Sequence, residues 1–312
     1  MAVSLFLGTM ADYQTKENEL VPILKIIPSS KEAKILLIGD IMFDRGIRYY
    51  AQKNGGNDFI FDKIHNQLLS YDLVLGNLEG PITENSSTSI DTKPGEPDNY
   101  FFTFDPSWAK TLFNNNIRIV NLGNNHILNF GQEGLRSTKQ YLDQSNVAYF
   151  GSPDYSRSAS QEILGVKITF INYNEFALLD EDINQKSILE EIQGVRGSSD
   201  IIIIYCHWGV EYAGSPAEEQ VNLAHKFIDG GADLVAGSHP HVIQPVEIYK
   251  GKRIYYSLGN FIFDQYFSKK TERGLGIVVG IDSGSKKLNF EELEFSLQPN
   301  GQTVLVEKSQ DK

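Results

Sequence analysis

Cysteine is nearly absent from this chain: Cys206 is the only one among 312 residues. An intramolecular disulfide is therefore excluded, but the compartment stays open because many exported bacterial proteins also lack disulfides. Long hydrophobic runs are missing too, since no segment approaches the roughly 20 apolar residues of a membrane-spanning helix. Cys206 precedes His207 at the end of an apolar run. We expect the two side chains to face opposite sides, with Cys206 in the core.

Basic residues are also fewer than acidic ones. The chain has 28 Lys and Arg against 40 Asp and Glu, which gives a net charge of −12 and a pI near 5.0. This balance argues against nucleic acid binding through a broad basic surface, because neutralising phosphates requires clustered Lys and Arg. It would also repel a polyanionic substrate, except where a bound cation inverts the local field.

The length and the 41% hydrophobic content are sufficient for one large domain. We expect an N-terminal extension or linker over residues 1–33, a single α/β domain over 34–297 and a polar C-terminal tail over 298–312. Residues 1–10 are apolar but lack the basic n-region of a signal peptide and are short for one. We interpret them as a frayed terminus, with the remnant of a trimmed anchor as the alternative.

The domain begins with a repeated pattern of apolar run, glycine turn and helical segment. Runs typical of strands buried on both faces occur at Lys34–Ile38, Leu73–Leu75, Ile117–Val120, Ile201–Ile204 and Leu234–Val235. Helical patterns at 106–115, 131–144 and 216–227 predict βαβ crossovers and a mixed sheet with helices on its faces. After Gly237 the chain is rich in strand patterns and tight turns. This region predicts a second, more antiparallel sheet packed on the first.

Side chains that can bind metals follow five of the expected strands. The segments are Gly39-Asp40 with Asp44-Arg45, Gly76–Glu79, Gly123–His126, His207–Glu211 and His239–His241. Because sites in open α/β sheets gather beyond the carboxyl ends of strands, these segments should converge. Imidazole nitrogens and carboxylate oxygens suit Zn, Mn and Fe. The set is large enough for two metals about 3.5–4 Å apart, the arrangement that clamps a phosphoryl transition state.

Other polar residues have plainer interpretations. His65 lies in a polar helical stretch and is expected at the surface, and His225 in the 216–227 helix is expected to be structural. Asparagine after a strand often only caps a turn. We favour a ligand role for Asn125, whereas Asn77 and Asn260 stay open between turn and site.

Together these motifs resemble the CapA, or poly-γ-glutamate capsule synthesis, family within the calcineurin-like metallophosphoesterase superfamily. The resemblance covers about Lys34 to Gln265 and rests on Gly39–Met42, Asn77–Glu79, Asn124–His126, His207–Tyr212, Gly237–Glu247 and Tyr256–Phe261. It implies an α/β fold of the metallophosphoesterase type, a four-layer αββα sandwich of mixed sheets with a dinuclear metal site at the sheet rim.

The resemblance also implies roles for single residues. Those that resemble metal ligands are Asp40, Glu79, Asn125, His207, His239 and His241. His126 resembles the general acid that protonates the leaving oxygen. Asn77 is the alternative to Glu79 at the position of the bridging aspartate. Apart from the resemblance, residues that would orient ligands or contact substrate are Asn77, Arg45, Glu211, Tyr212 and Asn260; for Glu211 the alternative is a solvated side chain.

Two positions depart from the wider superfamily. Its first motif is Asp-x-His, and here Met42 stands in place of the histidine, so one metal loses an imidazole. Its bridging aspartate is replaced by Asn77-Leu78-Glu79, in which the glutamate is one methylene longer.

The resemblance implies a CapA-like capsule (poly-γ-glutamate) synthesis protein. We expect a metal-dependent, phosphoesterase-like hydrolase with two divalent ions, Mn, Zn or Fe. The alternative is a non-catalytic accessory factor that binds an anionic polymer such as polyglutamate during capsule assembly or export. The expected partners are a phosphoester or polyglutamate and a membrane-associated capsule synthesis complex, but not nucleic acid. The family resemblance implies a location outside the cytoplasm or at the cell envelope.

Overall fold

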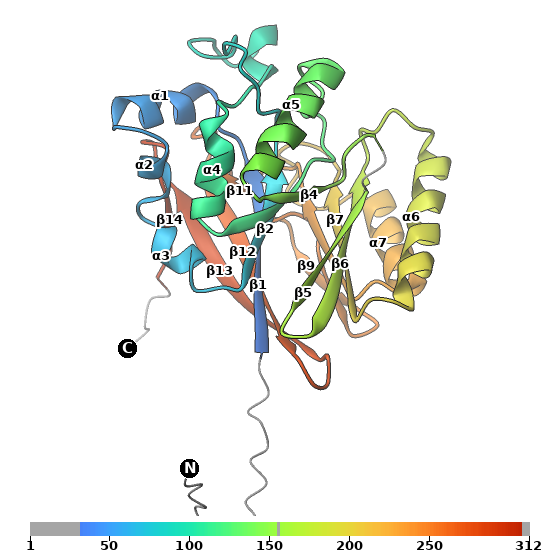
Figure 1. Ribbon diagram of the computed structural model, residues 1–312. Coiled ribbons are helices and arrows are strands. Elements are labelled where there is room, and N and C mark those ends of the chain that lie inside the picture. The colour runs from blue at the N-terminus through green and yellow to red at the C-terminus, as the bar shows by residue number, and fades with distance from the viewer. Residues whose placement is uncertain (1–31, 155–156, 308–312) are drawn as a thin grey trace, which may run out of the picture. The chain divides into compact units, whose positions relative to one another are not determined.

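Two mixed β-sheets pack face to face and carry helices on their outer faces (Figure 1). The computed structural model describes residues 32–154 and 157–307. Helices α1 to α5 cover one sheet, and α6 and α7 cover the other. The order of layers is therefore αββα, which confirms the expected fold class. None of the helices within the described residues is long and apolar enough to cross a membrane.

The first sheet has a parallel half and an antiparallel half that meet at β1. Its order is β14-β13-β12-β1-β2-β3-β4. The strands are β1 Glu32–Ile41, β2 Leu73–Leu78, β3 Ile117–Asn121, β4 Ala148–Phe150, β12 Arg273–Asp282, β13 Leu288–Leu297 and β14 Thr303–Leu305. A short strand, β11 Asn260–Ile262, pairs in parallel with the end of β1. Strands β1 to β4 are parallel, so their carboxyl ends lie at one rim.

The second sheet has the order β5-β6-β7-β8-β10-β9. Its strands are β5 Ser158–Ile163, β6 Val166–Asn174, β7 Ile201–His207, β8 Leu234–Ser238, β9 Val246–Tyr249 and β10 Lys252–Tyr255. Strands β6, β7, β8 and β10 are parallel neighbours. Every residue of β7 and β8 is buried, as the continuous apolar runs predict for strands covered on both faces.

The strands after Gly237 do not form a sheet of their own, which corrects our expectation. Strands β9 and β10 extend the second sheet beyond β8, whereas β12, β13 and β14 return to the first sheet beside β1. A local strand pattern identifies a strand but not its partner, and both sheets offered an open edge. Strand β14 also lies inside residues 298–312, which we expected to be a polar tail; Thr303 there is buried.

Apolar side chains fill the three spaces between the four layers. In β1, Ile35 and Leu37 face the second sheet, while Leu36 and Ile38 face the helices, as the two-residue period of a strand requires. One polar contact crosses the middle layer. The hydroxyl of Tyr205 on β7 donates to the carbonyl oxygen of Ile38 on β1 at 2.6 Å. The two sheets are therefore linked close to their shared rim.

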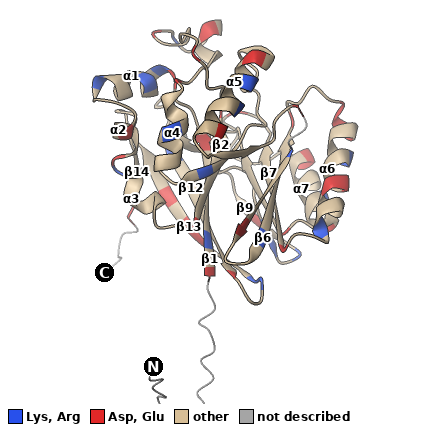
Figure 2. Ribbon diagram, in the orientation of Figure 1, with Lys and Arg blue, Asp and Glu red and all other residues tan. Residues whose placement is uncertain are grey.

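Three of the helices, α4, α5 and α7, match the predicted helical patterns, whereas α1, α2 and α6 were not predicted. The helices are α1 Arg45–Lys53, α2 Asp58–Phe61, α3 His65–Leu68, α4 Ser107–Asn114, α5 Gly131–Gln144, α6 Glu181–Arg196 and α7 Glu218–Gly230, with a 3₁₀ turn at Pro97–Tyr100. Side-chain caps begin two of them, Asp44 for α1 and Asp180 for α6. Acidic and basic residues are interspersed over these outer helices (Figure 2).

Candidate metal centre

Neighbouring strands of the first sheet end in polar side chains that lie in register. Asp40 on β1 pairs with Asn77 on β2, and Asn77 pairs with Asn121 on β3. A Cβ atom at Gly39 would lie 1.8 Å from the carbonyl oxygen of Gly259. The glycine therefore permits the chain before β11 to approach β1, where the Asp40 N–H donates to that oxygen at 3.0 Å. This packing fixes a fully buried carboxylate at the rim.

The second sheet brings histidines to the same rim. His207 ends β7, and its neighbour Cys206 packs among the helix-facing side chains, as predicted. His239 and His241 follow β8 with φ values of 95° and 57°. Residues other than glycine adopt such values rarely, and strain of this kind clusters at functional sites. The turn directs His241 towards Asp40, whose carboxylate also accepts the His239 N–H at 3.1 Å.

Side chains from both sheets meet in one buried cluster. His241 Nδ1 lies 3.3 Å from Asp40 Oδ2, and His241 Nε2 lies 3.5 Å from Glu79 Oε1. The rings of His207 and His239 have centroids 4.8 Å apart. Ligand atoms of Glu79, His239 and His241 lie within 4.8 Å of one another, as do those of Asp40, Glu79 and His207. Glu79 therefore belongs to two candidate ligand groups.

Two atoms of this cluster fit a bound cation. Glu79 Oε1 and His239 Nδ1 are buried, and neither has a hydrogen-bond partner among the residues that the structure describes. Leaving a polar atom buried and unpaired costs about 1–3 kcal/mol, so such atoms require an explanation. A divalent cation would satisfy both atoms, and the mixed nitrogen and oxygen set suits Zn, Mn or Fe. The residues present therefore fit a metal centre.

Hydrogen bonds around His241 leave its Nε2 available to a cation. Asn260 donates from Nδ2 to Gln265 Oε1 and to the Thr271 carbonyl, both at 3.1 Å, so its Oδ1 is the acceptor. His241 Nδ1 donates to that Oδ1 at 2.9 Å. When the ring is neutral, the lone pair of Nε2 therefore points towards Glu79 Oε1, where a cation would lie. Metal-binding histidines typically donate their second ring N–H to such a partner.

Burial sets the protonation of the cluster. It raises the pKa of Glu79 well above the usual value, and the nearby Asp40 carboxylate raises it further. Burial also opposes ionisation of Asp40, but the hydrogen bond and charge of His241 outweigh it, and the pKa of Asp40 falls below its usual range. Burial, followed by the charge of His241, lowers the pKa of His239 to about 4. Asp40 and His239 are thus held in the ionised and neutral states that bind metal, whereas Glu79 would release a proton when a cation binds.

Asn125 and His126 approach the cluster from the loop after β3. Asn125 is exposed, yet its Oδ1 lies 2.8 Å from His207 Nε2. His126 Nε2 lies 3.9 Å from Glu79 Oε1. Asn129 Nδ2 lies 3.3 Å from His126 Nδ1 and is a donor, so the ring proton belongs on Nε2, facing the cluster.

An amide network supports the cluster from the first sheet. Asn77 Nδ2 donates to Asp40 Oδ1 at 2.8 Å, and Asn77 Oδ1 accepts from Asn121 Nδ2 at 2.9 Å and from Asn124 Nδ2 at 3.1 Å. Asn77 therefore orients a carboxylate through a hydrogen bond. Asn121 was not among the predicted site residues, and its position at the end of the apolar run Ile117–Val120 was the available signal.

The remaining expected residues lie around the cluster or away from it. The Tyr212 ring has its centroid 6.1 Å from that of His241. Arg45 Nη2 pairs with Asp264 Oδ1 at 2.5 Å, beside the rim. Glu211 is exposed, in keeping with a solvated side chain. Met42 packs in the helix-side core.

The other two histidines lie outside the cluster. His65 is half-buried, and its Nδ1 lies 2.8 Å from Asn115 Oδ1. His225 on α7 has its Nε2 2.7 Å from Glu247 Oε1, and its ring stacks on Tyr249 with centroids 3.7 Å apart. These contacts give both histidines a structural role away from the cluster.

The fold and the cluster define a class: a four-layer α/β sandwich with a buried set of metal-type ligands where strands of both sheets end. More particularly, the chain belongs to the family described as bacterial capsule synthesis protein PGA_cap, whose model matches residues 34–265. The predicted family is thereby confirmed. The cluster, from Asp40 to Asn260, lies entirely inside the matched region.

Two curated relatives match most of this chain. It is 30% identical over 255 residues to the PGA biosynthesis protein CapA of Bacillus subtilis (strain 168), covering 76% of this chain and 65% of the relative. It is 26% identical over 264 residues to the capsule biosynthesis protein CapA of Bacillus anthracis, covering 79% and 63%. The chain thus spans just under two thirds of these relatives. A solved structure, TT1561 of Thermus thermophilus, is similar with a TM-score of 0.44 and 12% identity, over 84% of this chain and 99% of that chain.

Proposed function

We propose that this chain is a metal-dependent hydrolase of phosphoesters that acts in capsule synthesis. The observation that carries the proposal is the buried Glu79 carboxylate, which belongs to two groups of ligand atoms and keeps one oxygen without a hydrogen bond among the described residues. Glu79 would therefore be able to contribute a ligand to either of two ions. The names of the Bacillus relatives support the capsule context.

The ligand groups suggest how two divalent ions would be held. Asp40, Glu79 and His207 would hold one, with Asn125 beside His207, and Glu79, His239 and His241 would hold the other. Bound ions, most plausibly Mn, Zn or Fe, would supply Lewis-acid stabilisation of charge on phosphoryl oxygens and make water more acidic.

His126 is the proposed proton donor to the leaving oxygen. Its Nε2–H faces the cluster, and Phe102, with its ring centroid 4.5 Å away, covers the imidazole. Burial, followed by the charges of His241 and His239, lowers the pKa of His126 to about 3. An anionic phosphoryl group beside the ring would raise that pKa, because an opposite charge favours the protonated form.

Elemental analysis of the purified protein tests the metal centre first. Wild type should contain near-stoichiometric Mn, Zn or Fe, and the His239→Ala/His241→Ala variant should lose most of it. Metal-free wild type, even after reconstitution, would remove the hydrolase mechanism.

The substitution His126→Ala tests the proton donor. We expect unchanged metal content and a loss of about 10²–10⁴ in turnover of a phosphoester, the usual contribution of a general acid. His225→Ala, which removes a histidine outside the cluster, serves as the control and should keep both metal and turnover. Full activity in His126→Ala would show that this role is wrong.

An accessory role without hydrolysis is the competing outcome of the same measurements. A metal-loaded protein that hydrolyses no phosphoester but binds polyglutamate, with binding abolished by a chelator, would replace the hydrolase proposal. Absence of polyglutamate binding would eliminate the accessory role.

A further inference from the structure

One exposed aromatic side chain lies directly against the candidate metal ligands. The ring of Phe176 has its centroid 4.3 Å from that of His239 and 5.8 Å from that of His207. These two histidines belong to different candidate ligand groups. Phe176 is 39% exposed, whereas both histidines are buried. The Phe176 ring therefore combines contact with a histidine of each ligand group and exposure to solvent.

Hydrogen bonds hold the backbone of Phe176 next to the end of strand β7. Phe176 follows β6 by two residues, and its N–H donates to Asn174 Oδ1 at 3.1 Å. The neighbouring Glu175 N–H donates to the His207 carbonyl oxygen at 3.0 Å. The Glu175 carboxylate in turn accepts the Gly209 N–H at 2.6 Å. These bonds fix the loop after β6 relative to the candidate ligand His207.

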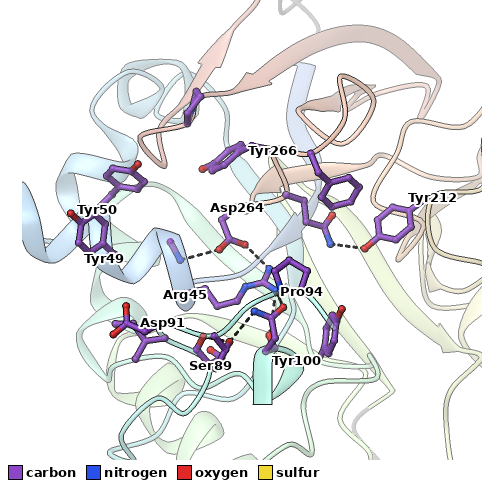
Figure 3. Close-up of a pocket in the computed structure, with 17 residues that line it drawn as sticks. Arg45, Tyr49, Tyr50, Ser89, Asp91, Pro94, Tyr100, Tyr212, Asp264 and Tyr266 are labelled. Atoms are coloured by element: carbon purple, nitrogen blue, oxygen red, sulfur yellow. Dashed lines mark hydrogen bonds and ion pairs between the residues drawn. The ribbon is translucent and has the colours of Figure 1, made fainter. Parts of the chain in front are cut away.

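Tyr212 is another exposed aromatic residue near the ligands, and it lines a separate cavity. Its ring centroid is 6.1 Å from that of His241, and its hydroxyl accepts from Gln265 Nε2 at 3.2 Å (Figure 3). The cavity has a volume of about 510 Å³. Among the described residues that line it, none is a candidate metal ligand. Of these two exposed rings, Phe176 is therefore the one that lies closer to the ligands.

The loops that follow β6 and β7 at this rim are apolar and acidic. Residues 172–184 and 207–214 contain no Lys or Arg, and their acidic residues are Glu175, Asp180, Glu181, Asp182 and Glu211. Leu178, Leu179 and Val210 in the same loops are exposed. An additional anionic group on a ligand would be repelled by these carboxylates, whereas an apolar group would remove exposed apolar surface from water. This side of the metal centre therefore favours an uncharged, apolar group.

We propose that Phe176 determines specificity by contacting an uncharged, apolar group on the alcohol side of the phosphoester. The inference rests on the proposed function, because the phosphoryl group of that ester would lie at the metal centre. The exposed part of the Phe176 ring packs against the apolar group and removes it from water. The substrate class is then a phosphate ester of an apolar alcohol.

Isothermal titration calorimetry on the Mn²⁺-loaded protein tests this contact without relying on turnover. The main probe is phenylphosphonate, whose carbon–phosphorus bond is not hydrolysed. Methylphosphonate is the reference without a ring, and 4-phosphonobenzoate is the same ring with an added carboxylate. We expect wild type to bind phenylphosphonate about tenfold more tightly than methylphosphonate, and 4-phosphonobenzoate more weakly than phenylphosphonate.

The substitution Phe176→Ala should weaken phenylphosphonate binding about fivefold, the size of one aromatic contact, and leave methylphosphonate affinity and Mn content unchanged. Phe176→Leu keeps an apolar side chain and should retain part of the preference for phenylphosphonate. Phe113→Ala is the matched control, because this half-buried ring lies at the end of α4, which leads into the amino end of β3. It should change neither affinity.

The proposal is overturned if wild type binds phenylphosphonate no better than methylphosphonate, if Phe176→Ala weakens both equally, or if 4-phosphonobenzoate binds most tightly. Each of these results leaves the proposed function standing, since methylphosphonate still binds at the metal centre. Metal-loaded protein that binds no phosphonate would instead reject the proposed function, and the specificity role with it. Binding that depends on Phe176 in a protein that hydrolyses no phosphoester would retain the contact and reject the proposed reaction.

Discussion

His239 combines an unfavourable backbone with an unpartnered ring nitrogen. Its φ of 95° is one that L-residues rarely adopt, and its Nδ1 is buried without a hydrogen bond among the described residues. Costs of this kind, about 1–3 kcal/mol for a strained backbone, persist where function requires the side chain. At this residue, the backbone conformation should lower the stability of the fold while the imidazole serves metal binding, so substitutions should affect the two properties differently.

The difference in free energy of unfolding between His239→Gly and His239→Ala measures the backbone strain at this residue. Both variants lose the imidazole and should lose metal, but only glycine adopts this φ without penalty. In the metal-free state we expect His239→Gly to be more stable than His239→Ala by about 1 kcal/mol, measured by urea unfolding. The order should reverse for His225→Gly and His225→Ala in helix α7, where glycine costs about 1 kcal/mol. If the two His239 variants were equally stable, the backbone at residue 239 would not be strained.

Asp233 links helix α6 to strands β7 and β10 of the second sheet. Its carboxylate accepts from Arg196 at the end of α6 and from Lys252 on β10, both at 2.6 Å, and from the Ile202 N–H on β7 at 2.9 Å. The residue immediately precedes β8, which ends near the metal centre. One carboxylate therefore links the start of β8 to α6, β7 and β10.

The substitution Asp233→Asn should destabilise the domain by about 1–3 kcal/mol, since it weakens charge-assisted bonds at a largely buried site. Burial raises the pKa of Asp233, but the bonds from Lys252 and Arg196 outweigh it and the net pKa is lowered. A lowered folded pKa means that this stability is present above the unfolded value of about 3.9 and is lost as pH falls through the folded pKa. Urea unfolding from pH 7 to pH 3 should show the variant converging on wild type.

Asp229→Asn provides the control, because its ion pair with Lys250 is exposed to solvent and such surface pairs contribute little to stability. If Asp229→Asn and Asp233→Asn were equally destabilising at pH 7, the buried contacts of Asp233 would not be the cause.

Some helices and strands could be predicted from their local sequence, and others could not. Buried strands such as β1 and β7 were predictable because a short apolar run has few alternatives to a covered strand. Helices α1, α2 and α6 were missed, although Ile188 and Ile192 of α6 are buried and spaced as on one helix face. The partners of β12 to β14 were wrong because pairing is decided by open sheet edges far away in the chain. The cavity was not foreseen, as its walls come from segments that the fold alone brings together.

The candidate ligands come from both sheets, so a bound metal ion would connect the two sheets. Asp40 and Glu79 belong to the first sheet or its rim, and His207 and His239 to the second. An ion that binds only the folded state stabilises it by about 2.7 kcal/mol at 100 times its Kd. Thermal unfolding should therefore shift upwards by several degrees with Mn²⁺, in proportion to log concentration, and return with a chelator. His239→Ala/His241→Ala should not respond; an unresponsive wild type would argue against a centre between the sheets.

The hydrogen bond between Tyr205 and the carbonyl of Ile38 lies two residues before His207 on one sheet and two before Asp40 on the other. It limits how far these two candidate ligands can move apart, although neither Tyr205 nor Ile38 offers an atom to the cluster. If a metal ion binds between these ligands, its preferred size would then depend partly on the packing between the sheets. The hydroxyl of Tyr205, which lies behind the site, would influence which ionic radius fits best.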